Sequence, residues 1–151
     1  MTERKVYRCN HCGNILSALM DGGVTPVCCG EETELLVPTT ADAAVEKHVP
    51  VITIKENVVT VKVGSVDHPM TEEHYIPWVM VLWENTSEVV HLKPGDVPQA
   101  IFTVTEQPAS PSAFGEKAHA LGLRVDTMPS DIGPVIAFAY CNLHGLWRAE
   151  I

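Results

Sequence analysis

Four of the five cysteines lie within the first 30 residues, in two close pairs. Two residues separate Cys9 from Cys12, and this spacing lets one turn present both sulfurs to a single ion. Cys28 and Cys29 are adjacent, so the peptide unit between them constrains the angle at any metal that both bind. The set predicts a four-thiolate metal centre rather than a disulfide pair. From these residues alone, a structural zinc ribbon stays open.

A second set of metal-binding residue types is spread over the rest of the chain. Cys141 stands alone, three residues before His144, and His48, His68 and His74 lie where we expect loops or strand ends. Binding sites are commonly built in such places. Taken singly, each histidine would more often be a surface or hydrogen-bonded residue than a ligand. Together, four imidazoles and a thiolate suit iron, copper or zinc, and the fifth donor favours a redox metal with an open position.

The other three histidines have no such setting. His11 lies between the first two cysteines, and we expect it to face water. His91 falls within an expected strand and His119 within an expected insertion, so neither is assigned to the second site.

Composition and charge exclude several classes of protein. The 151 residues are 46% hydrophobic and 19% charged, which favours a packed core over disorder. A formal net charge of -9 argues against nucleic acid as a partner. No apolar run approaches the roughly 20 residues of a membrane span, and the polar N-terminus lacks the apolar stretch of a secretory signal. We therefore expect a cytoplasmic protein with no membrane partner.

The chain divides into two expected domains. Residues 1–37 contain little apolar material, and so short a segment seldom folds without a metal or another cross-link. Residues 38–40, Pro-Thr-Thr, are the expected linker. The second domain, residues 38–151, contains an expected insertion over about 107–134 with a short helix at 113–121.

Short runs rich in Val, Ile and Thr predict the strands of the second domain. Turn-forming residues separate the runs, a texture that is typical of an immunoglobulin-like antiparallel β-sandwich. Pro77 should lie at a strand start or on an edge strand, because proline cannot donate to a β-ladder. The expected strands are 49–54, 58–63, 76–83, 88–92, 100–105 and 135–140.

Taken together, these residues resemble the desulfoferrodoxins, a family of two-iron superoxide reductases. Four motifs carry the resemblance: cysteines at 9, 12, 28 and 29, EKHVP at 46–50, HP followed by HYI within 68–76, and CNLHGLW at 141–147. The resemblance implies a mainly β protein: a small rubredoxin- or desulforedoxin-like domain stapled by metal, followed by the immunoglobulin-like sandwich. It also implies two irons, one held by Cys9, Cys12, Cys28 and Cys29, the other by His48, His68, His74 and His144 with Cys141 as axial ligand.

The family's activity is the one-electron reduction of superoxide to hydrogen peroxide at a ferrous iron. By resemblance, Lys47 would attract and orient superoxide, and the Glu46 carboxylate would fill the open position of the oxidised site. The four-cysteine iron would transfer electrons, with rubredoxin or a similar protein as the expected donor. Members are commonly homodimers. Pro77 and the 107–134 insertion depart from the family's pattern.

Two other functions stay open from the sequence. One is a small iron electron-transfer protein without superoxide chemistry, and the other is a zinc ribbon joined to a β-sandwich binding module. Metal content separates them, because two irons per chain support the reductase and zinc at both sites contradicts it.

Overall fold

The structure is a computed structural model, and it describes residues 4–40, 45–84, 86–104 and 133–151. Within these ranges it is nearly all β, as the sequence predicts, with one four-residue helix, α1 (Val45–His48). No helix of the described residues is long and apolar enough to cross a membrane. The expected insertion at 107–134 and its short helix lie almost entirely outside the described residues.

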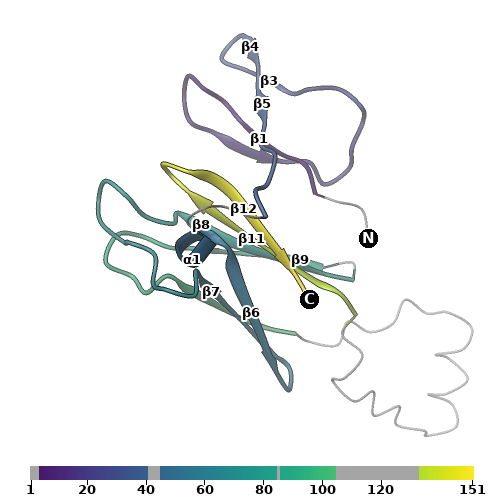
Figure 1. The fold of residues 1–151 in the computed structure, drawn as a ribbon. Helices are drawn as coiled ribbons and strands as arrows, with labels where there is room; N and C mark the ends of the chain where they lie inside the picture. Colours follow the sequence, from purple (N-terminus) through teal and green to yellow (C-terminus); the bar gives the residue numbers. More distant parts are fainter. Residues whose placement is uncertain (1–3, 41–44, 85, 105–132) are drawn as a thin grey trace, which may run out of the picture.

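Seven antiparallel strands form two sheets that face one another (Figure 1). The three-stranded sheet has the order β10-β7-β6, with β6 (Pro50–Lys55), β7 (Val58–Val63) and β10 (Gln99–Thr103). The four-stranded sheet has the order β12-β11-β8-β9, with β8 (Trp78–Trp83), β9 (Thr86–His91), β11 (Val135–Cys141) and β12 (Gly145–Glu150). The expected immunoglobulin-like sandwich is therefore confirmed.

Six of these strands coincide with the predicted runs to within two residues at each end. Pro77 comes immediately before β8, where its missing N–H costs no bond within that strand, and its carbonyl accepts a hydrogen bond from the Leu92 N–H at 2.9 Å. β12 was missed, because GLWRAE lacks the run of Val, Ile and Thr used to recognise the others.

Strand β11 is buried along its whole length because both of its faces are covered. Its odd-numbered side chains, from Val135 to Cys141, belong to the core between the two sheets, together with residues of β7 and β8. Its even-numbered side chains, Ile136, Phe138 and Tyr140, belong to a second apolar cluster on the outer face of the four-stranded sheet. Cys141 thus ends a strand that is fixed from two sides.

The N-terminal domain consists of short strands. β2 (Ile15–Ser17), β1 (Val6–Arg8) and β5 (Glu34–Leu35) form one sheet in that order, and β3 (Val27–Cys28) pairs with β4 (Glu31–Glu32) in a hairpin. These strands could not be predicted from the sequence, because runs of two or three residues are too short to show a periodic pattern.

The two domains are in contact (Figure 1). Val6 is 1% exposed and lies in the same apolar cluster as Trp78, Phe138 and Tyr140, with Leu36 packed against that cluster. The expected linker also joins the second domain, since the Thr39 N–H donates to the Leu146 carbonyl at 2.9 Å. The residues predicted as a simple linker are therefore anchored to β12.

This contact predicts an effect of Val6→Ala on stability. The substitution removes two buried methyl groups, which corresponds to about 1–3 kcal/mol of lost burial and cavity formation. We expect a lower urea midpoint by intrinsic fluorescence for Val6→Ala. The matched control is Val24→Ala, because the Val24 side chain is 80% exposed and should leave the midpoint unchanged. Equal midpoints for the two variants would contradict a stabilising domain contact.

Candidate metal centres

The first pair of cysteines lies in a tight turn that follows β1. The Gly13 N–H donates to the Cys9 carbonyl at 3.0 Å, and the Cys9 N–H donates to the Asn14 carbonyl at 2.9 Å. Gly13 has φ +78°, a conformation that side chains with a Cβ rarely adopt. The turn therefore brings Cys9 and Cys12 to the same side of the loop, as their spacing predicts.

The adjacent pair is accommodated by the turn between β3 and β4. Cys28 is the last residue of β3 and pairs with Glu31, so Cys29 and Gly30 are the two central residues of a hairpin turn. Both have positive φ, 53° and 82°, as a type I′ turn requires. Because Cys28 lies in the strand and Cys29 in the turn, their side chains leave a sharply bent backbone. The bend lets both sulfurs reach the same cluster although a single peptide unit joins the two residues.

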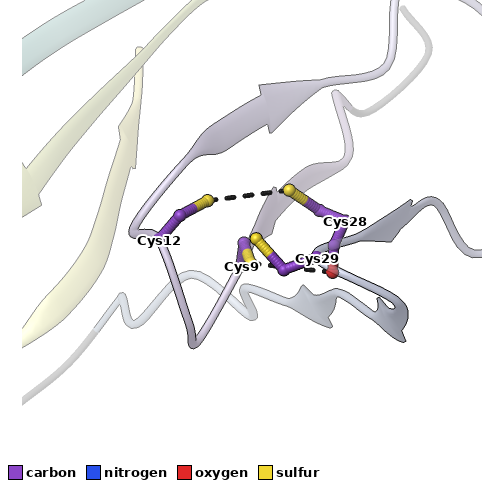
Figure 2. Close-up of side chains that lie close together, drawn as sticks. All are labelled: Cys9, Cys12, Cys28 and Cys29. Atoms are coloured by element: carbon purple, nitrogen blue, oxygen red, sulfur yellow. Dashed lines mark hydrogen bonds between the residues drawn. The ribbon is translucent and has the colours of Figure 1, made fainter.

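The four sulfurs converge on one point (Figure 2). All four Sγ atoms lie within 4.8 Å of one another, and the Cys12 and Cys28 sulfurs are 3.6 Å apart. Cys9 is buried whereas Cys12 and Cys29 are exposed, so the cluster lies at the surface of the small domain. The donor set and its spacing could hold one tetrahedral iron or zinc ion.

The thiol pKa values show why a cation fits this cluster. The backbone N–H groups of Cys12 and His11 donate to Cys9 and lower its pKa to about 6. The neighbouring sulfurs, Cys12 first, raise the pKa of Cys29 to about 12. The protein alone therefore favours a thiolate at Cys9 and keeps Cys29 protonated, chiefly because Cys29 shares side-chain hydrogen bonds with the neighbouring sulfurs. A bound cation favours the thiolate at Cys29 as well.

His11 lies between the two cysteines of the first pair but outside the cluster. Its exposed ring forms a 2.8 Å contact from Nε2 to the Glu31 carboxylate. The ring faces the surface, as expected.

The second site is a ring of four imidazoles. Adjacent ring centroids are 4.9 Å apart for His48 and His68, 4.6 Å for His68 and His74, 5.0 Å for His74 and His144, and 4.7 Å for His144 and His48. Adjacent rings are nearly perpendicular, with interplanar angles of 70–78°. The His48–His74 diagonal is 6.2 Å. These distances describe a near-square arrangement, in which each ring lies beside two others.

Cys141 lies beside this square. Its side chain is fully buried, and its Sγ is 3.5 Å from Nδ1 of His144. Ligand atoms of His48, His74, Cys141 and His144 all lie within 4.8 Å of one another, and His68 joins them through its ring contacts. His48 and His68 are buried, His74 is half-buried and His144 is exposed. The group thus has a buried side and a side that solvent reaches.

Nε2 of His68 and Nε2 of His74 are buried and have no hydrogen-bond partner among the described residues. His68 uses its other nitrogen, Nδ1, to donate to the Pro69 carbonyl at 2.7 Å, which leaves Nε2 as an acceptor. A buried polar atom without a partner is costly, and a metal ion would satisfy both nitrogens at once. The residues therefore fit a metal.

The pKa values favour neutral imidazoles at this site. The pKa of His68 is lowered to about 4, chiefly by burial and to a smaller extent by the other three rings, while the Pro69 carbonyl opposes the shift. Burial also lowers the pKa of His74, followed by the effects of His144 and the Lys47 charge. Neutral imidazole is the form that binds metals. Burial raises the pKa of the Cys141 thiol, while the N–H groups of Leu143 and His144 favour its thiolate.

Trp147 is a residue of this site to which the sequence analysis assigned no role. Its ring stacks on the His48 imidazole at a centroid distance of 4.6 Å and an interplanar angle of 20°. Trp147 is buried in β12, and its backbone forms the bridge to Thr39. The sequence feature that could have indicated a role for Trp147 is its position at the end of the CNLHGLW motif, three residues after His144.

The structure also locates Lys47 and Glu46, the candidates next to His48, and one of the two histidines that were not assigned to the site. Lys47 is exposed in α1, and its charge acts on His74. Glu46 also lies in α1, but its side chain is outside the description. His91, at the end of β9, is exposed, and His119 lies outside the described residues.

Comparisons with protein families agree with this arrangement. The family model "Desulfoferrodoxin, N-terminal domain" matches residues 2–36, and the model "Desulfoferrodoxin" matches residues 40–150. The chain belongs to the desulfoferrodoxin family. The first match covers the four cysteines, and the second covers the four histidines and Cys141.

Individual relatives extend the comparison over nearly the whole chain. A desulfoferrodoxin from Nitratidesulfovibrio vulgaris is 40% identical over 148 residues, covering 98% of this chain and 97% of its own. A "putative superoxide reductase" from Archaeoglobus fulgidus is 30% identical over 118 residues, or 74% of this chain and 91% of its own. The solved superoxide reductase from Treponema pallidum has a TM-score of 0.68 and 26% identity, with 97% of both chains covered.

The geometry predicts that the two centres load separately. Cys12→Ser removes one of four sulfurs from the first cluster, whereas the described residues 4–37 supply no metal-binding side chain to the histidine ring. We expect the variant to lose one metal ion per chain and keep the other, measured by metal analysis after anaerobic purification. Ser17→Ala, at an exposed position of β2, is the control and should retain both ions. Loss of both ions in Cys12→Ser would contradict separate centres.

Proposed function

We propose that this protein is a superoxide reductase with two iron sites per chain. The observation that carries the proposal is the near-square of four imidazoles beside the buried Cys141 sulfur. A purely structural zinc site usually takes four ligands, and a set of five donors suits a redox metal with a position left for a small ligand. Membership of the desulfoferrodoxin family supports the same activity.

The overall reaction consumes one electron and two protons for each superoxide and yields hydrogen peroxide. A ferrous iron held by His48, His68, His74, His144 and Cys141 would supply that electron and return to the ferrous state by accepting one from a donor. The chain's own contribution is to hold these donors close together and to favour neutral imidazole at His68 and His74. Burial favours the neutral form of His68 and His74, and at Cys141 the N–H groups of Leu143 and His144 oppose in part the burial that raises the thiol pKa.

Lys47 would attract the substrate to the exposed side of the ring. Superoxide is an anion and the chain has a formal net charge of -9, so a local positive charge is needed at the site. Lys47 immediately precedes His48, and its charge is felt at His74. We assign the Glu46 carboxylate to the open position of the oxidised site on the basis of the EKHVP motif.

The four-cysteine iron of residues 1–37 would serve electron transfer rather than the chemistry of residues 38–151. We propose rubredoxin or a similar small protein as the electron donor. A homodimer in the cytoplasm completes the proposal, in keeping with the family's usual organisation.

Cys141→Ser tests the activity. Replacing the thiolate should remove the thiolate-to-iron charge-transfer absorption and reduce superoxide consumption at least about a hundredfold, because loss of a group that only supports a ligand already costs about 10- to 100-fold. The measurement is absorption spectroscopy of reduced and oxidised protein, followed by mixing with a superoxide pulse. His91→Ala is the control, because this exposed histidine at the end of β9 should change neither result.

Metal content and superoxide consumption, measured together, distinguish the reductase from the two other functions. Two irons per chain with rapid superoxide consumption support the proposal. Iron without superoxide consumption would instead indicate an electron-transfer protein, and zinc at both sites would indicate a binding module.

Lys47→Ala tests the proposed attraction. Loss of a positive charge near the anion should slow the second-order reaction with superoxide about tenfold, while iron content and spectra stay unchanged. Salt screens such attraction, so the wild-type rate should fall as ionic strength rises and the variant rate should fall less. Stopped-flow or pulse-radiolysis rates across a salt series provide the measurement.

Lys55→Ala is the matched control for this series. Lys55 is exposed at the far end of β6, and its loss changes the net charge by the same amount. If Lys47→Ala and Lys55→Ala have the same rates and salt slopes, Lys47 is an ordinary surface charge.

A further inference from the structure

Asn142 connects two parts of the histidine ring that lie far apart in the sequence. It follows Cys141 directly and begins the turn between β11 and β12, the turn that also carries His144. His74 belongs to a different segment, between β7 and β8. The segment of His74 and the turn of His144 must therefore be joined for their rings to lie 5.0 Å apart.

Three hydrogen bonds make that connection, and they bracket His74. The Tyr75 N–H donates to Asn142 Oδ1 at 2.9 Å, and the Asn142 Nδ2 amide donates to the Glu73 carbonyl at 3.0 Å. The Asn142 N–H donates to the Tyr75 carbonyl at 3.2 Å. Because one partner is a donor and the other an acceptor, the orientation of the side-chain amide is settled by its surroundings.

Local contacts shape the His74 loop but do not locate it. Thr71 Oγ1 accepts a hydrogen bond from the His74 N–H at 3.1 Å, and the Thr71 N–H donates to the His74 carbonyl at 3.0 Å. Both partners belong to the same loop, so these bonds would persist if the loop moved as a unit. The bonds to Asn142 tie the loop to the turn that carries Cys141 and His144.

We propose that Asn142 is a positioning residue that holds His74 in the geometry required for iron binding. It acts through the backbone on both sides of His74, while the buried Nε2 of that ring faces the other imidazoles without a hydrogen-bond partner among the described residues. Removing a group that orients a metal ligand commonly lowers metal affinity or activity. The inference rests on the proposed function, because it assumes iron at the histidine ring.

The test measures how fast ferrous iron leaves the full-length protein. Wild type, Asn142→Ala and Asn142→Asp, each loaded with ferrous iron, are mixed anaerobically with excess of a ferrous chelator that absorbs when it binds iron. Asn142→Ala removes both side-chain hydrogen bonds. Asn142→Asp nearly preserves the shape and can still accept from the Tyr75 N–H, but an ionised carboxylate cannot donate to the Glu73 carbonyl.

We expect iron to leave the histidine site about tenfold to a hundredfold faster in Asn142→Ala, with a smaller or similar acceleration in Asn142→Asp. Release from the four-cysteine site should be unchanged and is an internal reference. Asn57→Asp is the matched control, because it introduces the same charge at an exposed turn between β6 and β7 and should behave as wild type.

A second measurement separates positioning from general stability. Thermal unfolding of the metal-free Asn142 variants should resemble that of the metal-free wild type, because the proposed effect depends on bound iron. Unchanged release rates in both Asn142 variants would overturn the inference, as would faster release matched by an equal loss of stability without metal. A wild type that binds no iron at the histidine ring would instead refute the proposed function, and this result is read directly from its metal content.

Discussion

The burial of strand β11 on both faces is the constraint on which the rest of the structure depends. Its inward side chains complete the core of the sandwich, and its outward side chains meet the N-terminal domain. Strands β8 and β12 pair with it on either side over nearly its full length. A strand held in this way has little freedom, so its last residue, Cys141, is presented to the histidine ring from a rigid support.

The histidine site is built from a rigid strand, which ends at Cys141, and from the loops and short helix that carry the four histidines. His68 and His74 come from the segment between β7 and β8, His48 from the short helix before β6, and His144 from the β11–β12 turn. Such loops can expose an open position to solvent, which a strand in the core cannot do. Hydrogen bonds from Asn142 and the stacking of Trp147 on His48 connect these loops to the sheet. Solvent access and precise geometry are therefore obtained together.

The two centres use different means to gather their ligands. In the first, local turns suffice, because the Cys9–Cys12 loop and the Cys28–Cys29 hairpin each supply two sulfurs. In the second, every histidine depends on the fold of the whole sandwich. The linker residue Thr39 forms a backbone bridge to Trp147, whose ring stacks on His48, and Val6 of the N-terminal domain lies in the apolar cluster on the outer face of the same sheet. The domains are thus physically connected although each builds its own site.

Residue types and local spacing determined much of this protein from the sequence alone. The cysteine pairs predicted a shared cluster because two residues between cysteines fit one turn, and runs of Val, Ile and Thr predicted six strands of the sandwich. Tertiary structure decided which histidines become neighbours, since His48 and His144 are 96 residues apart and meet only through the pairing of sheets. It also decided the burial of Val6, the pairing of β12 and the hydrogen bonds of Asn142. Those features depend on contacts between distant segments, and spacing along the chain carries no information about them.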